Sequence, residues 1–374
     1  MKGVTKGNIK KYALNEFLKE YKELNTDNKY RPVAVGRYGI RKRESIYSKE
    51  LAKDYSKNKL IHKGTLTVGM GSKQIDIGIL IEDETFAVSP AYHTYEIQGI
   101  RCKYLEYCLQ SKNIEMFSLY AKRGSRQGKS IDLKRWLTYK IPVYSEKDQI
   151  VIEENLNKIN YVIELRRKQI DLLDELIKAR FVEMFGDISI NDKNWNNALL
   201  GELCKIVRGG SPRPIEKFLG GEVPWIKIGD ATKGDNIYLH STKEHIISEG
   251  VSKSRLVKAG SLIFANCGVS LGFARIITFD GCIHDGWLAL EDIDERLDKV
   301  FLLQSLNQMT EHFRSIAPAG TQPNLNTAIM KKYRQVIPPI ELQREFIVFC
   351  EEIDKSRLRE LLAIKHIKLL LKNL

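Results

Sequence analysis

The side chains best suited to chemistry in this sequence are cations interleaved with aromatic residues near its start. Residues 1–60 contain 16 Lys and Arg against 7 Asp and Glu, and the densest stretch is 37–43, RYGIRKR. Lysine attracts backbone phosphates without regard to sequence, whereas arginine can also form two hydrogen bonds with a guanine edge. We interpret this stretch as a nucleic-acid contact loop, with an ordinary solvated loop as the alternative. The expected contact residues are Arg37, Tyr38, Arg41, Lys42 and Arg43.

A second set of polar and cationic residues lies in glycine-containing loops elsewhere in the chain. The stretch 208–214, RGGSPRP, is interpreted as the counterpart of 37–43, with a turn that exposes backbone N–H groups and holds two arginines close together. In the strand expected after it, Trp225 should lie in the core. Loops 123–127 and 320–324 carry Gln, Asn and Arg, which pair with adenine and guanine edges. With Lys73, these regions add the expected contacts Arg123, Arg126, Gln127, Arg208, Ser211, Arg213, Lys227, Lys233, Gln322 and Asn324.

Catalytic and metal-binding patterns are not found in the sequence. Gly124–Ser130 is one residue short of phosphate-loop spacing, and Gly69–Gly71 is interpreted as a turn. Ser89–Tyr92 resembles only in outline the Asn/Asp-Pro-Pro-Tyr loop with which amino-methyltransferases hold a target base. His284 and Asp285 are adjacent on an expected strand, so they should point to opposite faces. Histidines and cysteines show no metal-ligand spacing, and we therefore expect no catalytic residue and no metal site.

Composition indicates a soluble globular chain with a polyanionic partner. The 374 residues carry a net charge of +13 on a 43% hydrophobic background, which suits two or three domains. No apolar run approaches the roughly 20 residues of a membrane span, and the start resembles no secretory signal. The six cysteines are scattered and are interpreted as reduced thiols, so the expected compartment is the cytoplasm.

The sequence contains an internal repeat at an offset of 196 residues. A chance recurrence of common turn and helix-start chemistry is the alternative, but the offset holds over a long stretch. The aligned landmarks are Leu60–Leu66 with Leu256–Leu262, Gly124-Ser125 with Gly320-Thr321, and Ile141-Pro142 with Ile337-Pro338. Each half therefore has the same order of parts.

Short strands and helices are expected in the first part of each half. Apolar, β-branched runs predict strands at Thr65–Val68, Ile75–Ile81 and Ser261–Ala265, and amphipathic patterns predict helices at Lys103–Tyr120 and Lys299–Ile316.

A long helix is expected to close each half. Glu146–Phe185 contains no Pro or Gly, and its apolar residues recur at steps of four and three with Arg166 in a gap. Glu341–Leu374 has a similar stripe, interrupted by Arg357 and Glu360. We expect the two helices to bury their stripes against each other in antiparallel orientation; separate docking of each helix on its own domain is the alternative.

These patterns predict an α/β (α+β) protein with two similar domains, separated by two long antiparallel, coiled-coil-like helices and related by a pseudo-two-fold repeat. The expected boundaries are 1–145 for the first domain, 146–186 for the first helix, 187–339 for the second domain and 340–374 for the second helix.

The sequence resembles the DNA-specificity subunit of type I restriction–modification systems over its whole length, and most strongly in the second half. The resemblance rests on Leu200-Gly201-Glu202, Gly209–Pro212, Val223–Asp230, Gly320-Thr321-Gln322 and Val336–Arg344. In that family a proline-containing step and a glutamine introduce each conserved helix. The first half departs from this pattern, because its glutamine, Gln149, is displaced along the sequence and the Gly-Gly-Ser-Pro turn is missing.

The resemblance implies a non-catalytic subunit in which two target-recognition domains each read one half of a bipartite double-stranded DNA site. The helices would set the spacer and dock two methyltransferase subunits, with restriction subunits as further partners. S-adenosylmethionine, ATP and Mg would then belong to those partners, and this chain would bind no cofactor and no membrane. Two alternatives stay open: a specificity chain with its own nuclease or methylase activity, and a non-specific nucleic-acid-binding coiled-coil scaffold.

Replacement of Arg41, Lys42 and Arg43 with Ala should weaken DNA binding and flatten its dependence on salt, because fewer phosphate contacts release fewer counterions. Binding to one duplex measured over a series of salt concentrations tests this. An unchanged slope would remove these residues from the interface.

Overall fold

The structure is a computed structural model that describes residues 10–36, 39–47, 54–123, 129–232, 236–268, 270–318 and 323–372. The chain divides into two compact units, Met1–Leu165 with Lys365–Leu374, and Arg166–Ile364. The division falls within the long helices, so the four-part boundaries expected from the sequence stay a prediction. In the part of the chain that the structure describes, no helix has the length and apolar character that a membrane crossing requires.

The first unit is built around an antiparallel sheet with strand order β2-β9-β6-β7. Helices α1 and α2 contribute Leu105, Leu109 and Met116 to its core, where Trp136 is fully buried. The elements before the first long helix are β1 (Lys10–Ala13), η1 (Leu14–Glu16), β2 (Leu18–Glu20), β3 (Val33–Gly36), β4 (Gly39–Lys42), η2 (Arg43–Ser45), β5 (Lys59–Ile61), β6 (Thr65–Met70), β7 (Ile75–Ile79), β8 (Phe86–Val88), β9 (His93–Ile97), α1 (Cys102–Ser111), α2 (Asn113–Tyr120), β10 (Ala121–Arg123), β11 (Lys129–Ile131), α3 (Leu133–Trp136) and β12 (Lys140–Val143).

The second unit contains two sheets, ordered β14-β22-β19-β20-β16 and β17-β15-β21-β18. Between the long helices α4 (Glu146–Phe185) and α10 (Ile340–Lys372) lie β13 (Asn196–Leu199), α5 (Leu200–Leu203), β14 (Lys205–Arg208), η3 (Ile215–Lys217), β15 (Leu219–Ile226), η4 (Ile228–Asp230), β16 (Tyr238–Leu239), β17 (Glu244–Ile246), α6 (Ser248–Val251), β18 (Arg255–Val257), β19 (Leu262–Ala265), β20 (Ala274–Ile277), β21 (Gly281–Ile283), β22 (Trp287–Glu291), α7 (Lys299–Gln308), α8 (Thr310–Ile316), α9 (Thr327–Lys331) and β23 (Arg334–Ile337).

The two units repeat the same internal topology, as the sequence predicted. The order β2-β9-β6-β7 recurs as β14-β22-β19-β20, and the outer pair β1-β12 recurs as β13-β23. The landmark turn is also the same: Gly64 and Gly260 both have positive φ, and their N–H groups donate to Leu80 and Ile277 at 2.8 and 2.7 Å. The predicted strands are confirmed as β6, β7 and β19.

Each helix predicted after the last strand of the sheet is broken into two. Instead of one helix at 103–120, α1 ends at Ser111 and α2 begins at Asn113. The second unit has the same break, between Gln308 and Thr310. The amphipathic pattern did not reveal the breaks, because apolar residues on both sides of each break contribute to the same core.

A buried glutamine joins the start of each long helix to the globular part of its own unit. Gln149 accepts from the N–H of Arg101, the N-cap of α1, at 3.1 Å and donates to the Tyr144 carbonyl. Gln343 accepts from the N–H of Asp298, the N-cap of α7, at 2.9 Å and donates to Pro338. The displacement of Gln149 along the sequence therefore leaves its structural position unchanged.

In the first unit, α4 is held to α1 by charge as well as by packing. Glu153, which is buried, accepts two hydrogen bonds from the Arg101 guanidinium, both 2.9 Å, and one from the Tyr104 N–H. Farther along α4, Asn157 accepts from the Tyr107 hydroxyl at 2.6 Å. This part of the helix is thus a fixed component of the first unit.

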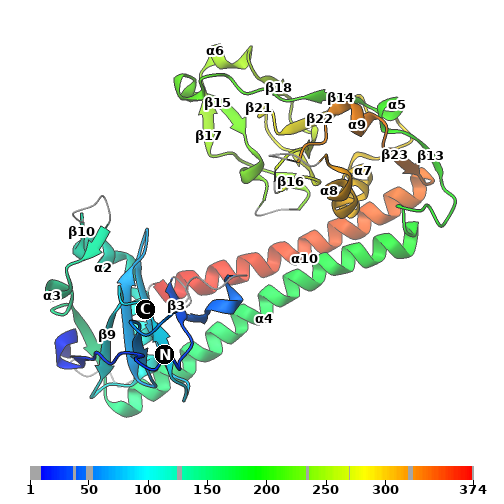
Figure 1. The fold of residues 1–374 in the computed structure, drawn as a ribbon. Helices are drawn as coiled ribbons and strands as arrows, with labels where there is room; N and C mark the ends of the chain where they lie inside the picture. The colour runs from blue at the N-terminus through cyan, green and yellow to red at the C-terminus, as the bar shows by residue number, and fades with distance from the viewer. Residues whose placement is uncertain are drawn as a thin grey trace. The chain divides into compact units, whose positions relative to one another are not determined.

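In the second unit, α4 and α10 run side by side and antiparallel (Figure 1). Arg166 pairs with Glu360 at 2.5 Å and Arg180 with Glu345 at 3.0 Å, so residue numbers rise along one helix as they fall along the other. Where α4 ends and α10 begins, four fully buried rings pack with centroid separations of 4.8 to 5.8 Å. They are Phe181, Phe185, Phe301 and Phe346.

The charged residues that interrupt the helical stripes are paired between the helices. Arg357 is 6% exposed and binds Asp174 of α4 and Asp354 of its own helix. Asp174 also accepts a hydrogen bond from Asn236 at 3.0 Å. Because a displaced register would leave these charges without partners, the pairs specify one alignment of the helices.

Arg357→Leu should destabilise the chain by about 2 kcal/mol, because it leaves the two carboxylates without their cation in a half-buried site. Arg357→Leu with Asp174→Leu should recover much of that loss, and Arg180→Leu, whose partner Glu345 is exposed, should cost under about 1 kcal/mol. Denaturant unfolding of the three variants measures these differences. A double variant less stable than the single one would contradict the register argument.

Candidate nucleic-acid interface

The centre of the candidate interface in the second unit is the turn that joins β21 to β22. Its Trp287 N–H donates to the His284 carbonyl at 2.9 Å. His284 and Asp285 lie in this turn and not in a strand, and His284 Nε2 is 3.0 Å from Asp285 Oδ1. The expectation that the two side chains point to opposite faces was therefore wrong, because alternation holds only within a strand.

Three predicted contact residues surround Asp285. The Ser211 hydroxyl donates to Asp285 Oδ1 at 2.8 Å, and Arg213 lies 3.6 Å from Oδ2 with 80% of its side chain exposed. Arg208 Nε donates to the Asp285 backbone carbonyl at 3.0 Å. The two arginines of the stretch 208–214 thus both lie beside Asp285, one at its backbone carbonyl and the other at its carboxylate.

The N–H groups of both glycines in this stretch are bonded within the protein, which corrects the prediction that they are exposed. The N–H of Gly209 donates to Trp287 at 2.9 Å, and that of Gly210 donates to Ile283 at 3.0 Å. A Cβ at position 209 would lie 2.2 Å from the His284 carbonyl oxygen. The glycines serve a close approach of two backbones, so the side chains of Arg208, Ser211 and Arg213 are the groups of this stretch that can contact a ligand.

Lys227 extends the cationic surface on the other side of His284. It directly follows β15, which ends at Ile226. Its ammonium group pairs with Glu244 at 2.6 Å and lies 5.1 Å from the centroid of the Trp225 ring. Trp225 is 3% exposed, which confirms its place in the core.

Asn324 completes the set in the second unit. Its side-chain oxygen accepts from Asn266 Nδ2 at 3.1 Å, and Asn266, which is fully buried, donates its N–H to Gly286 of the central turn. Five predicted contacts are therefore brought together around one turn. They are Arg208, Ser211, Arg213, Lys227 and Asn324.

The electrostatics favour an ionised Asp285 beside a neutral His284. Burial raises the pKa of Asp285, but the Ser211 hydroxyl, His284 and the nearby arginines outweigh burial and hold this pKa below its usual value. Burial lowers the pKa of His284, and Lys227 and the arginines lower it further against the attraction of Asp285. Because Nδ1 accepts from the Gly286 N–H at 2.8 Å, Nε2 carries the proton that faces Asp285.

The first unit has a hollow of about 500 Å³ at the same place in its topology. Equivalent positions in the two units can be assigned from the register of the strands. They can also be assigned from the helix caps Asp132 and Asn326, whose side chains accept from the N–H groups of Arg135 and Ile329. On this basis Ala34, Met70, Ala91 and Ser130, which line the hollow, correspond to Lys227, Asn266, Gly286 and Asn324.

The central turn itself is repeated. Tyr92 N–H donates to the Ser89 carbonyl at 3.1 Å, as Trp287 does to His284. The Tyr92 ring covers Gly69, where a Cβ would lie 2.3 Å from it, and its hydroxyl donates to Val35 at 2.8 Å. Gly69 belongs to strand β6, so its interpretation as a turn was wrong.

The cations of the first unit are distributed around the hairpin β3–β4 and the hollow. Arg41 and Lys42 are exposed on β4, and Lys42 lies 3.7 Å from Glu84. Arg43 lines the hollow and lies over the Tyr55 ring at 5.7 Å. Lys73 is exposed in the β6–β7 turn.

Several predicted contacts lie outside the described residues: Arg37, Tyr38, Arg126, Gln127, Lys233 and Gln322. Arg123 ends strand β10, and its side chain is not described.

The stretch 208–214 is not the counterpart of 37–43. Arg208 pairs with Leu288 across β14 and β22, and the same register in the first unit places Lys22, just after β2, in its position. Residues 37–43 instead follow the segment that matches Trp225-Ile226. The two domains therefore carry their cations on different elements of a shared scaffold.

Sequence reasoning missed the central turns as parts of the interface. Ser89–Tyr92 and the pair His284-Asp285 were considered from the sequence only as candidates for catalysis. The repeat could have identified both segments as equivalent. The first lies before Tyr95 in β9 and the second lies the same distance before Leu290 in β22, and these two residues occupy equivalent positions. Asn266 was also missed, and its full burial explains why composition alone did not reveal it.

Comparison with known proteins gives the class. Residues 192–366 match the family model described as type I restriction modification DNA specificity domain. The type I restriction enzyme MjaIX specificity subunit of Methanocaldococcus jannaschii is 20% identical over 185 residues, 48% of this chain and 43% of that protein. A second protein of that organism, named for the same kind of subunit (MjaX), is 23% identical over 267 residues, 67% of this chain and 61% of its own length.

A solved structure of similar fold is described as concerning complex assembly and conformational transition of the type I R-M system. It has a TM-score of 0.61 and 15% sequence identity, and the similarity covers 100% of this chain and 97% of that one. The matched stretches span less than two thirds of either curated relative. Residues 192–366 thus match a type I restriction–modification DNA specificity domain, and the predicted resemblance to the specificity subunits of those systems is confirmed.

Asp285 should make the stability of the chain depend on pH. Because its pKa is lowered in the folded state, its carboxylate contributes stability above the pKa of an unfolded aspartate, about 4, and this contribution is lost as pH falls through the folded pKa. Denaturant unfolding of the wild type and Asp285→Asn from pH 3 to 7 should show a difference that shrinks below about pH 4. A difference that grows on acidification would contradict the assignment.

Proposed function

We propose that this chain is the sequence-specific DNA-recognition subunit of a type I restriction–modification complex. The observation that carries the proposal is that two repeated domains each place cationic side chains beside the same turn of a shared scaffold, although on different elements. The specificity-domain match and the basic composition support it. Each domain reads one half of a bipartite target in double-stranded DNA, with arginine, asparagine and serine contacting base edges and lysine contacting phosphates.

The helices set the distance between the half-sites. α4 is continuous over 40 residues, and residues in its first part bind the first recognition domain while Asp174 and Phe181 bind the second unit. A helix rises about 1.5 Å per residue, so its length can define a separation in base pairs.

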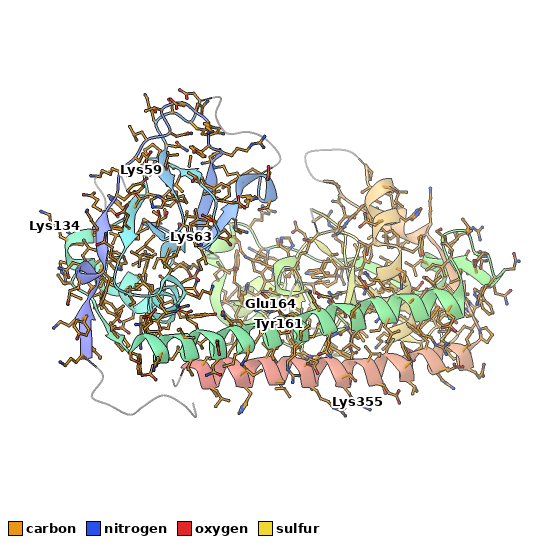
Figure 2. The ribbon with its side chains drawn as sticks, turned by 90° about the horizontal axis from the view of Figure 1, so that it is seen from below. Lys59, Lys63, Lys134, Tyr161, Glu164 and Lys355 are labelled. Carbon is orange, nitrogen blue, oxygen red and sulfur yellow. The ribbon has the colours of Figure 1, made fainter. Side chains whose placement is uncertain are left out.

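The same helices dock two methyltransferase subunits, and restriction subunits join the complex. Large apolar side chains are exposed at steps of four and seven on both helices, a spacing that places them on one face. On α4 these are Tyr161, Leu165, Leu172 and Leu176, and on α10 they are Leu358, Leu362 and Leu369. Tyr161, 62% exposed, is labelled on α4 in Figure 2. Such exposed stripes are typical of protein–protein interfaces.

The chain acts without catalysis of its own and works in the cytoplasm. S-adenosylmethionine, ATP and Mg are bound by the partner subunits, and this chain supplies the recognition of DNA to their reactions. The cationic clusters in both units are suited to this role, since they bind and orient DNA without a nucleophile or general base.

Methylated bases mapped in the DNA of cells that express this chain with its methyltransferase should form one bipartite motif. Removal of one heptad from α4 (164–170) together with the paired heptad of α10 (358–364) should shorten the spacer by about three base pairs, since seven residues of helix span about 10.5 Å. Replacement of the same heptads by others of equal length is the control. Altered half-sites with an unaltered spacer would contradict the role of the helices.

A further inference from the structure

The repeated central turn carries different chemistry in the two units. In the second unit, the position after His284 is Asp285, whereas the first unit has Pro90 there. Proline offers no side-chain hydrogen bond, but a carboxylate is an acceptor on both oxygens. If this turn faces DNA, the second domain presents a hydrogen-bond acceptor at this position, whereas the side chain of the first domain presents none.

The Asp285 carboxylate has an unused acceptor. Oδ1 accepts from the Ser211 hydroxyl and faces His284 Nε2, so its capacity is filled. Among the described residues, Oδ2 has only the Arg213 guanidinium, at 3.6 Å, which is too long for a hydrogen bond. About a third of the side chain is exposed, 32%. Oδ2 can therefore accept from a ligand without breaking the contacts that hold the turn.

A carboxylate in a cationic surface is costly for affinity, because it repels phosphates. Here the repulsion is limited by Arg208, Arg213 and Lys227, which surround the turn and attract the backbone. In the major groove, the donors that a carboxylate can meet are exocyclic amino groups, and cytosine N4 is the partner that aspartate prefers. Adenine presents the acceptor N7 beside its amino group, and guanine presents the two acceptors N7 and O6. These acceptors repel a carboxylate.

We propose that Asp285 is a specificity-determining residue that selects a cytosine in the half-site read by the second unit, through a hydrogen bond from the cytosine 4-amino group to Oδ2. The inference rests on the proposed DNA-recognition function and adds a base preference to it. Ser211 and His284 position the carboxylate, and Arg208 and Arg213 offset its charge. The first unit, with Pro90 at this position, makes no such selection.

The first test selects duplexes from a randomised library with the full-length chain and its methyltransferase. The wild type should yield a bipartite consensus with a cytosine in one half-site, and Asp285→Asn should lose that preference or shift it toward adenine, which an amide can bind through N6 and N7. The control Glu291→Gln removes a carboxylate of similar exposure that pairs with Lys205 at the other end of β22, and its consensus should equal that of the wild type.

The second test changes the DNA and leaves the protein intact. Replacement of the selected cytosine by 2-pyrimidinone, which lacks the 4-amino group, should weaken wild-type binding about tenfold, and should have little further effect on Asp285→Asn. If Asp285→Asn does not fold, Asp285→Glu, which keeps the charge but moves it, should change the preference at that one base pair only.

Equal loss of affinity for all sequences in Asp285→Asn, with an unchanged consensus, would overturn the proposal and leave Asp285 a structural residue. Insensitivity of the wild type to 2-pyrimidinone would also overturn it. A wild-type complex that selects no consensus would instead refute the proposed function itself, so the two failures are distinguishable.

Discussion

The architecture depends on one buried interaction that occurs twice, a glutamine at the start of each long helix. Gln149 and Gln343 each accept a hydrogen bond from the N-cap residue of the short helix that follows the recognition sheet, and each donates to a carbonyl just before its own helix. Both are almost completely excluded from water. Because loss of either side chain would leave backbone groups buried without partners, the direction of each long helix is tied to its domain.

Much of this arrangement could be predicted, because it rests on patterns that span many residues. The heptad-like stripes identified both long helices, and the repeat identified two domains of one topology. The breaks within the shorter helices, the strand that contains Gly69 and the counterpart of Arg208 were missed. Each depends on a local tertiary contact, such as a ring over a glycine, which leaves no periodic trace in the sequence.

The candidate interface could also be predicted only in part from the sequence. Charge and glycine content identified Arg208, Ser211 and Arg213 from the sequence, and their convergence on Asp285 follows from the pairing of β14 with β22. The turn that carries Asp285 was found only through the structural repeat. Basic residues account for attraction to a polyanion, whereas an acid among them, Asp285, would add the base selectivity proposed above.

The exposed leucines of α4 and α10 have a consequence for the abundance of this chain in a cell. An unassembled copy presents Leu172, Leu358 and Leu362 to water, each more than half exposed. Such stripes favour self-association and capture by quality-control proteases, whereas burial in a complex shields them. If methyltransferase subunits cover these helices as proposed, copies made in excess of those subunits would thus be removed, and the number of copies would follow the supply of those subunits.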